Sequence, residues 1–276
     1  MERAKVNGVE LEYEVKGSGE PVLLISPVVA DGFRPFLSAP ALVDRYRLIR
    51  YHRRGWRGST HTTRSVTISD HAADAAALLE HLEVARAHVA GHSSGGSIAM
   101  QLAFERPDLV QTLILLEPSI LSLPSAQTLF ESAAPSLEAY RNGDHERAVA
   151  GFLSLVSGLD WETCRAVLDE HVPGGVAQAI EDADTFFGIE LPALGAWEFG
   201  AAQAATIAQP VLSVLGSDTG ALWLETATLL RAWFPQAEEH TVEGVGHLLH
   251  LQCGVDIVRA FAAFVHRHPM AGTLVS

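Results

Sequence analysis

Short, largely apolar runs constrain the fold of this chain more than any other feature. The runs occupy residues 21–25, 47–51, 87–90, 112–116 and 211–215. A strand that is covered on both faces, as in a parallel sheet, reads as such a run. Between the runs, apolar residues recur at helical spacing in residues 70–84, 96–105, 223–234 and 256–266. This alternation of strands and helices predicts an α/β fold with right-handed crossovers.

Two segments depart from this alternation. Residues 9–16 alternate apolar and polar side chains, which predicts a half-exposed strand and antiparallel structure at the start of the chain. Residues 119–206 contain no convincing strand. Within them, apolar residues of 148–156 share one helical face, and Asp160 is a candidate cap for a second helix that runs to about His171. We therefore expect a helical insertion within the sheet.

Composition excludes several classes of protein. The chain has 276 residues, of which 48% are hydrophobic, so it can bury a large core. A net charge of -14 repels nucleic acid and anionic lipid, so neither polymer is an expected partner. No apolar run approaches the length of a membrane span, and we expect a cytoplasmic protein. The two cysteines, Cys164 and Cys253, suggest no disulfide framework, and both are expected to be buried thiols.

The segment most informative about chemistry lies between an apolar run and a helix. It carries the pattern G-x-S-x-G as Gly91, Ser93 and Gly95. A nucleophile on a sharp strand-to-helix turn needs small neighbours, and the turn presents the serine oxygen at the positive end of the helix. The bare pattern also occurs by chance in glycine-rich turns. The flanking strand and helix are therefore the stronger reason to interpret Ser93 as a nucleophile. Ser93 is the candidate nucleophile.

A serine hydroxyl needs a base that removes its proton. His247 is the first candidate because it lies in a Gly-Val-Gly-His loop between an expected strand at 239–243 and the final helix, late enough to follow the acid in the chain. His250 is its nearest rival. The spacing of the two histidines matches no zinc signature, so we expect neither a metal nor any other cofactor.

Together these segments resemble the α/β hydrolase superfamily, and the resemblance covers almost the whole chain. It rests on the run at 22–25 with its following loop, the segment 51–59 (YHRRGWRGS), the turn at Ser93, and three further segments. These are Leu115-Leu116-Glu117-Pro118, residues 210–216 and Gly246-His247. The resemblance implies an eight-stranded, mostly parallel sheet. It also implies a core of residues 1–118 and 207–276 with a helical cap at 119–206.

By the same resemblance, backbone N–H groups of Val28 and Ser94 would form an oxyanion hole. Many relatives carry His-Gly where this chain has Ser26-Pro27. Proline lacks only its own N–H, so neither expected donor is lost.

The acid that orients the histidine has two candidates. The usual family position is three residues after the glycine that ends strand seven, which here is Thr219, while Asp218 lies one residue earlier. Relatives such as haloalkane dehalogenases and zearalenone lactonases place the acid after strand six, and Glu117 resembles that arrangement. Glu117 is the preferred acid and Asp218 the alternative.

Two further groups have expected roles. His52, Arg53 and Arg54 are expected to anchor loops through hydrogen bonds and ion pairs, outside the active site. The expected cap is rich in aromatic residues, which suits an apolar pocket, although most aromatics at helical spacing belong to the core. These residues are Phe130, Phe152, Phe186, Phe187, Trp197 and Phe199.

The resulting expectation is a cofactor-free serine hydrolase that cleaves an ester or lactone of a neutral, apolar small molecule through Ser93, His247 and Glu117. One alternative is carbon–carbon bond hydrolysis or perhydrolysis on the same residues. Another is a hydrolase-fold receptor that binds a ligand with little turnover. Dehalogenation and epoxide opening are disfavoured, because relatives with those activities carry aspartate at the position of Ser93.

Overall fold

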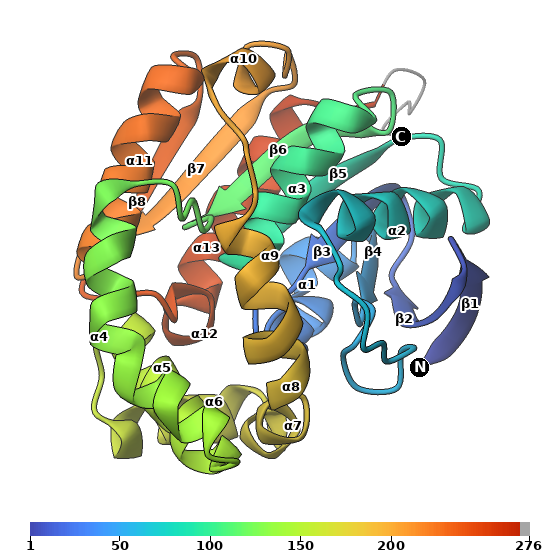
Figure 1. Cartoon of the computed structure of the whole chain (residues 1–276). Helices are drawn as coiled ribbons and strands as arrows, with labels where there is room; N and C mark the ends of the chain where they lie inside the picture. Colours follow the sequence, from blue (N-terminus) through green and yellow to red (C-terminus); the bar gives the residue numbers. More distant parts are fainter. Residues whose placement is uncertain (271–276) are drawn as a thin grey trace.

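The computed structural model describes residues 1–270, which contain one eight-stranded sheet (Figure 1). The strand order is β1-β2-β4-β3-β5-β6-β7-β8. The strands are β1 (Glu2–Val6), β2 (Val9–Lys16), β3 (Glu20–Ile25), β4 (Tyr46–Tyr51), β5 (Ala87–His92), β6 (Val110–Leu116), β7 (Val211–Gly216) and β8 (Glu238–Val242). β2 pairs antiparallel with β1 and β4, and all remaining pairs are parallel. The predicted α/β fold is confirmed, and the five apolar runs are β3 to β7.

Strand β1 was not predicted, because its polar residues at every second position give it no apolar run. It forms a hairpin with β2, in which Val6 pairs with Val9 across a two-residue loop. Asn7 and Gly8 in this loop have φ angles of 45° and 76°. A two-residue hairpin turn of type I′ requires positive φ at both positions, and Asn-Gly is among the sequences that adopt these angles most readily.

Helices cover both faces of the sheet. In the part outside the stretch between β6 and β7, they are η1 (Arg34–Ser38), α1 (Pro40–Val43), α2 (Ile68–His81), α3 (Ser94–Glu105), α11 (Ala221–Trp233), α12 (Leu249–Gln252) and α13 (Gly254–Arg267). α2 and α3 pack on one face, in front of the sheet in Figure 1, whereas α1 and α13 pack on the other. The four predicted helices of this part are present, with ends that differ by up to three residues.

The chain between β6 and β7 is helical wherever it is regular. Its helices, here called the inserted helices, are α4 (Pro124–Arg141), α5 (His145–Ser157), α6 (Trp161–His171), α7 (Gly175–Glu181), α8 (Ala183–Thr185), the π-helix η2 (Phe186–Glu190), α9 (Leu191–Gly195) and α10 (Ala201–Ala204). Asp160 caps α6 as predicted, since its carboxylate accepts the Thr163 N–H at 2.9 Å. Figure 1 shows α4 to α9 gathered on one side of the molecule, away from the β1–β2 hairpin.

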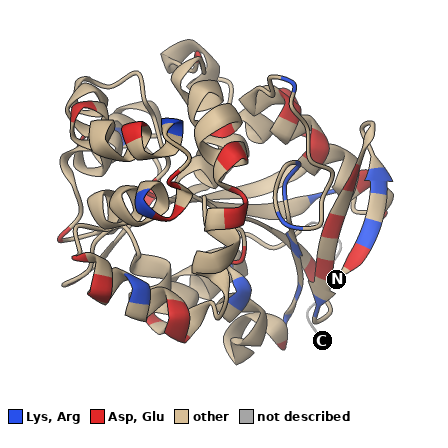
Figure 2. Ribbon diagram, turned by 60° about the horizontal axis from the view of Figure 1, so that its bottom comes forward, with Lys and Arg blue, Asp and Glu red and all other residues tan. Residues whose placement is uncertain are grey.

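Charged residues lie on helices around the molecule, and basic and acidic residues lie close together on the strands beside the N-terminus (Figure 2), where Arg3 of β1 pairs with Glu10 and Glu12 of β2. Cys164 is buried as expected, but the expectation for Cys253 is wrong, because it lies between the short α12 and α13 and is only partly buried. Within residues 1–270, no helix is long and apolar enough to cross a membrane.

Candidate active site

Ser93 occupies the turn between β5 and α3. Its φ and ψ angles are 54° and -123°, a conformation that a non-glycine residue adopts only when its surroundings impose it. Close packing around the turn explains the neighbouring glycines. A Cβ at Gly91 would collide with the carbonyl oxygen of Gly95, and a Cβ at Gly95 would collide with that of Ile25. The Ser93 hydroxyl lies 3.1 Å from the hydroxyl of Ser119, its one hydrogen-bond partner within residues 1–270.

His247 lies in the loop after β8 and is 4% exposed. Its Nδ1 is 2.6 Å from Oε2 of Glu117. The ring stacks on the indole of Trp223 in α11, with 3.8 Å between ring centroids and 25° between planes. A carboxylate can only accept hydrogen bonds, so this contact puts the imidazole proton on Nδ1 and leaves Nε2 as the free base.

Glu117 directly follows β6 and has a φ of 43°, which is unusual for this residue type. Besides His247, two donors hold its carboxylate. The Gly216 N–H donates to Oε1 at 2.8 Å, and the Thr219 hydroxyl donates to Oε2 at 3.0 Å. Asp218 is exposed and accepts a hydrogen bond from Ser217 instead. Of the two candidate acids, the structure brings Glu117 to His247.

Burial shapes the protonation of this pair. Removal from water raises the pKa of Glu117, and the donors from Gly216 and Thr219 oppose that rise. Burial also lowers the pKa of His247 far below its ordinary value. Both directions follow from the cost of placing a charge in a medium of low polarity. His247 is therefore neutral at pH 7, as a general base must be.

His250, the rival base, lies in α12 and is 1% exposed. Its ring packs against His92 at 4.1 Å between centroids. Neither ring nitrogen of His250 has a hydrogen-bond partner within the described chain, so no carboxylate orients this imidazole. Of the two histidines, only His247 has the acid contact that a base in a triad requires.

Val28 follows β3, and Ser94 begins α3. Among the described residues, neither backbone N–H donates to another protein group. Both residues line the same pocket as Ser93 and His247. Two free N–H groups beside a nucleophile can bind the negative oxygen of a tetrahedral intermediate.

The pocket above Ser93 is almost wholly apolar, and within residues 1–270 no Lys, Arg, Asp or Glu lines it. Its walls come from the loop after β3, the inserted helices, α11 and the segment 247–251. The lining residues are Pro27, Val28, Val29, His92, Ser93, Ser94, Ser119, Leu121, Leu129, Phe130, Ala133, Phe152, Leu153, Val156, Leu168, Phe186, Leu191, Leu194, Leu222, Trp223, His247, Leu248, His250 and Leu251. The structure thus places the expected nucleophile, base and N–H donors around one cavity.

Of the six aromatic residues considered for the pocket, Phe130, Phe152 and Phe186 line it. Phe187 stacks on Tyr140 instead, with 5.1 Å between centroids. Trp197 and Phe199 pack with the core that covers α3. Periodicity could not separate the two groups, because each contains both buried and partly buried aromatics.

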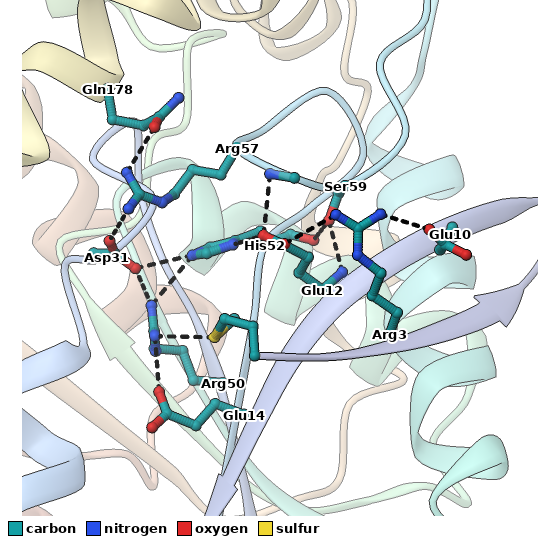
Figure 3. Close-up of polar contacts among 12 residues, drawn as sticks. Arg3, Glu10, Glu12, Glu14, Asp31, Arg50, His52, Arg57, Ser59 and Gln178 are labelled. Atoms are coloured by element: carbon teal, nitrogen blue, oxygen red, sulfur yellow. Dashed lines mark hydrogen bonds and ion pairs between the residues drawn. The ribbon is translucent and has the colours of Figure 1, made fainter.

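Figure 3 shows His52, one of the three expected loop anchors, within a polar network. Its Nδ1 lies 3.0 Å from Glu12 on β2, and its Nε2 lies 2.9 Å from Asp31 in the loop after β3. Arg57 extends the same network to Gln178 of α7 at 2.9 Å. The anchoring prediction is confirmed for His52, which ties the loop after β3 to the antiparallel edge of the sheet.

The two neighbouring arginines are anchors as well. Arg54 makes two hydrogen bonds to Asp74 of α2, at 2.5 and 2.6 Å. Arg53 forms a buried ion pair with Glu190 of the π-helix. Neither arginine lines the pocket.

Three residues at the site were missed at the sequence level. Ser119 touches the nucleophile, Trp223 supports His247, and Thr219 holds Glu117. Of these three, only Thr219 could have been noticed in the sequence, because it occupies the position where many relatives carry the acid.

The structure offers no site for a metal ion within residues 1–270. No cluster of three or more His, Cys, Asp or Glu side chains there has an arrangement that could hold one.

Comparison with known proteins agrees with this geometry. The model of the alpha/beta hydrolase fold family matches residues 27–252. The chain is 27% identical over 256 residues to the "Putative carbamate hydrolase RutD" of Azorhizobium caulinodans, an alignment that covers 90% of this chain and 91% of that protein.

Two solved structures are similar over nearly their whole length. A hydrolase from Pseudomonas aeruginosa PA01 has a TM-score of 0.78 at 25% identity, covering 95% of this chain and 96% of the other. A thermophilic esterase from Thermogutta terrifontis has a TM-score of 0.81 at 20% identity, covering 98% and 100%, which is a likeness of fold. From its sheet, its nucleophile turn and these matches, this chain belongs to the alpha/beta hydrolase fold family.

Proposed function

We propose that the protein is a serine hydrolase that cleaves an ester or lactone of a neutral, apolar small molecule. The observation that carries this proposal is the contact between Glu117 and His247 beside Ser93, at the base of an apolar pocket. In the proposed triad, Ser93 is the nucleophile, His247 is its base, and Glu117 is the acid that orients the base.

The first half of the reaction forms an acyl-enzyme. His247 Nε2 takes the hydroxyl proton of Ser93 as Oγ attacks the carbonyl carbon. Glu117 stabilises the resulting imidazolium, and the N–H groups of Val28 and Ser94 bind the negative oxygen. As the tetrahedral intermediate collapses, the carbon–oxygen bond to the alcohol breaks and His247 returns the proton to that alcohol.

The second half repeats these roles with water as the nucleophile. His247 takes a proton from water, the hydroxide attacks the acyl carbon, and the acid product leaves as Ser93 regains its proton. Because the Ser93 hydroxyl rests against Ser119, we infer that it turns toward His247 when substrate binds. Hydrogen bonds at such sites often tighten only in the substrate complex.

The pocket lining supports a neutral substrate. A carboxylate or ammonium group bound against these walls would lose its hydration without a charged partner in return. We propose that residues 119–206 act as a cap over the core of residues 1–118 and 207–276, because the inserted helices supply Phe130, Phe152 and Phe186 to the pocket.

Turnover on a substrate panel tests this proposal. The panel holds p-nitrophenyl esters of increasing acyl length, neutral lactones and a neutral carbamate, the last because one relative is named for carbamate hydrolysis. We expect ester or lactone hydrolysis that is absent in Ser93→Ala. Folded wild-type protein that binds these compounds without turnover would instead support a ligand receptor.

A further inference from the structure

Arg53 contacts the loop that carries the expected oxyanion donor. It follows β4, and its side chain is 2% exposed. One guanidinium nitrogen donates to the carbonyl oxygen of Pro27 at 3.0 Å. That oxygen and the N–H of Val28 belong to a single peptide group.

A peptide group is planar, so its carbonyl oxygen and N–H point in opposite directions, and fixing one fixes the other. A charged donor on the oxygen also polarises the group and makes its N–H a stronger donor. The Val28 N–H donates to no other group within residues 1–270, and Val28 lines the pocket with Ser93. The hydrogen bond from Arg53 therefore acts on a peptide group whose N–H is free within the described residues and whose Val28 lines the pocket.

Arg53 is itself held in a defined position. Its other terminal nitrogen pairs with Glu190 of the π-helix, a residue that is fully buried. The indole N–H of Trp56 donates to the same carboxylate oxygen at 3.0 Å, and the guanidinium carbon lies 5.2 Å from the centre of the indole ring. The network of Figure 3 holds the next part of the loop through Asp31, which contacts Arg50 and His52. Little freedom is left to the Pro27–Val28 peptide.

We propose that Arg53 is a positioning residue of the oxyanion hole, which orients and polarises the Val28 N–H through the Pro27 carbonyl and is fixed there by Glu190 of the inserted helices. This inference rests on the proposed serine hydrolase function. It gives Arg53 a role beyond the anchoring of a loop. Under this proposal, the stabilisation that the oxyanion hole gives to the negative oxygen depends on the contact between Arg53, which follows β4, and Glu190 of the inserted helices.

The test compares two double variants that each remove a buried ion pair without leaving a lone charge. Arg53→Met/Glu190→Gln removes the donor to Pro27 and keeps an acceptor for Trp56. Arg54→Met/Asp74→Asn removes the neighbouring pair, which does not touch the Pro27 carbonyl. Both are compared by thermal unfolding, by kcat and KM on a p-nitrophenyl ester, and by the rate at which a fluorophosphonate labels Ser93.

We expect the Arg53→Met/Glu190→Gln variant to lose on the order of 10- to 100-fold in kcat and in labelling rate, with KM changed less than about threefold, because the hole acts on the transition state. The Arg54→Met/Asp74→Asn control should keep kcat within about threefold at a comparable loss of melting temperature. Equal kcat values in the two double variants would overturn the proposal.

Arg53→Lys supplies a second measurement if the double variant does not fold. Lysine keeps a positive charge for Glu190 but lacks the planar fork that reaches both acceptors. We expect reduced kcat at nearly unchanged KM and an intact fold, and wild-type kcat in this variant would contradict the proposal. A wild-type enzyme without turnover dependent on Ser93 would refute the proposed function itself, an outcome separate from failure of the inference about Arg53.

Discussion

The hydroxyl of Thr219 donates a hydrogen bond to the carboxylate of Glu117 at 3.0 Å. Thr219 stands where many members of the family carry the acid of the triad, and Glu117 stands after the neighbouring strand. Glu117, the proposed acid, directly follows β6, and its hydrogen-bond donor Thr219 lies in the loop after β7.

Glu117→Gln should be nearly inactive while Asp218→Asn keeps most of the activity. The amide cannot offset the positive charge of His247 and does not hold its proton on Nδ1, so kcat should fall by about 10³-fold or more. Asp218 is exposed and contacts Ser217. The measurement is kcat on a p-nitrophenyl ester with circular dichroism to verify folding. The reverse order of activities would assign the acid to the loop after β7.

In Thr219→Val, the decline of kcat/KM on the acid side of its pH profile should begin at higher pH than in the wild type. Burial already raises the pKa of Glu117, and the Thr219 hydrogen bond opposes that rise. Without the Thr219 hydrogen bond, the carboxylate of Glu117 binds a proton more readily. A protonated Glu117 donates to Nδ1 of His247, so the imidazole carries its own proton on Nε2 and cannot act as a base. The activity ratio of variant to wild type should therefore fall as pH decreases. A net hydrogen bond of about 1 kcal/mol corresponds to a shift of roughly 0.7 pH units. Parallel pH profiles would contradict this role.

Neutral acyl groups should be preferred to anionic ones. The comparison is between p-nitrophenyl pentanoate and mono-p-nitrophenyl succinate, whose acyl chains are similar in length but differ in a terminal carboxylate. Because the pocket offers no cationic partner among its described lining residues, kcat/KM should be about 100-fold higher for the neutral ester. Equal values would mean that the acyl group binds outside this pocket.

Gly95→Ala should destabilise the protein, whereas Gly254→Ala should not. A Cβ at Gly95 would collide with the carbonyl oxygen of Ile25 on β3, while a Cβ at Gly254 in α13 would meet no atom within 4 Å. We expect the melting temperature of Gly95→Ala to fall by about 4 °C or more, with loss of activity, and that of Gly254→Ala to stay or rise slightly. Equal melting temperatures for the two variants would show that the turn accommodates a Cβ atom at position 95, contrary to this prediction.

The fold was largely predictable because short, contiguous segments of the sequence specify its strands, its helices and the turn at Ser93. Buried strands read as short apolar runs, and the glycines around Ser93 reflect a packing requirement of one turn. Strand β1 was the exception, since an edge strand with polar alternating positions carries no such run. The expected burial of Cys253 was also wrong, because composition does not reveal that it lies at the partly buried break between α12 and α13.

The site was predictable only in part, because its contacts join distant segments. His247 and Glu117 are separated by 130 residues, so sequence alone left Glu117 and Asp218 both open as the acid. Ser119 and Trp223 reach the site through α/β topology and the packing of α11, which no spacing pattern encodes. The link from Arg53 to Pro27 is likewise visible only when β3 and β4 lie side by side.

Covalent labelling of the nucleophile determines whether the protein hydrolyses esters through Ser93. The protein is treated with a fluorophosphonate, and its intact mass, the labelled peptide and the residual ester hydrolysis are followed together. We expect one adduct per chain on Ser93, loss of hydrolysis in proportion to labelling, and no adduct in Ser93→Ala. Hydrolysis that persists in fully labelled protein, or an adduct on another residue that accompanies the loss of activity, would contradict this expectation.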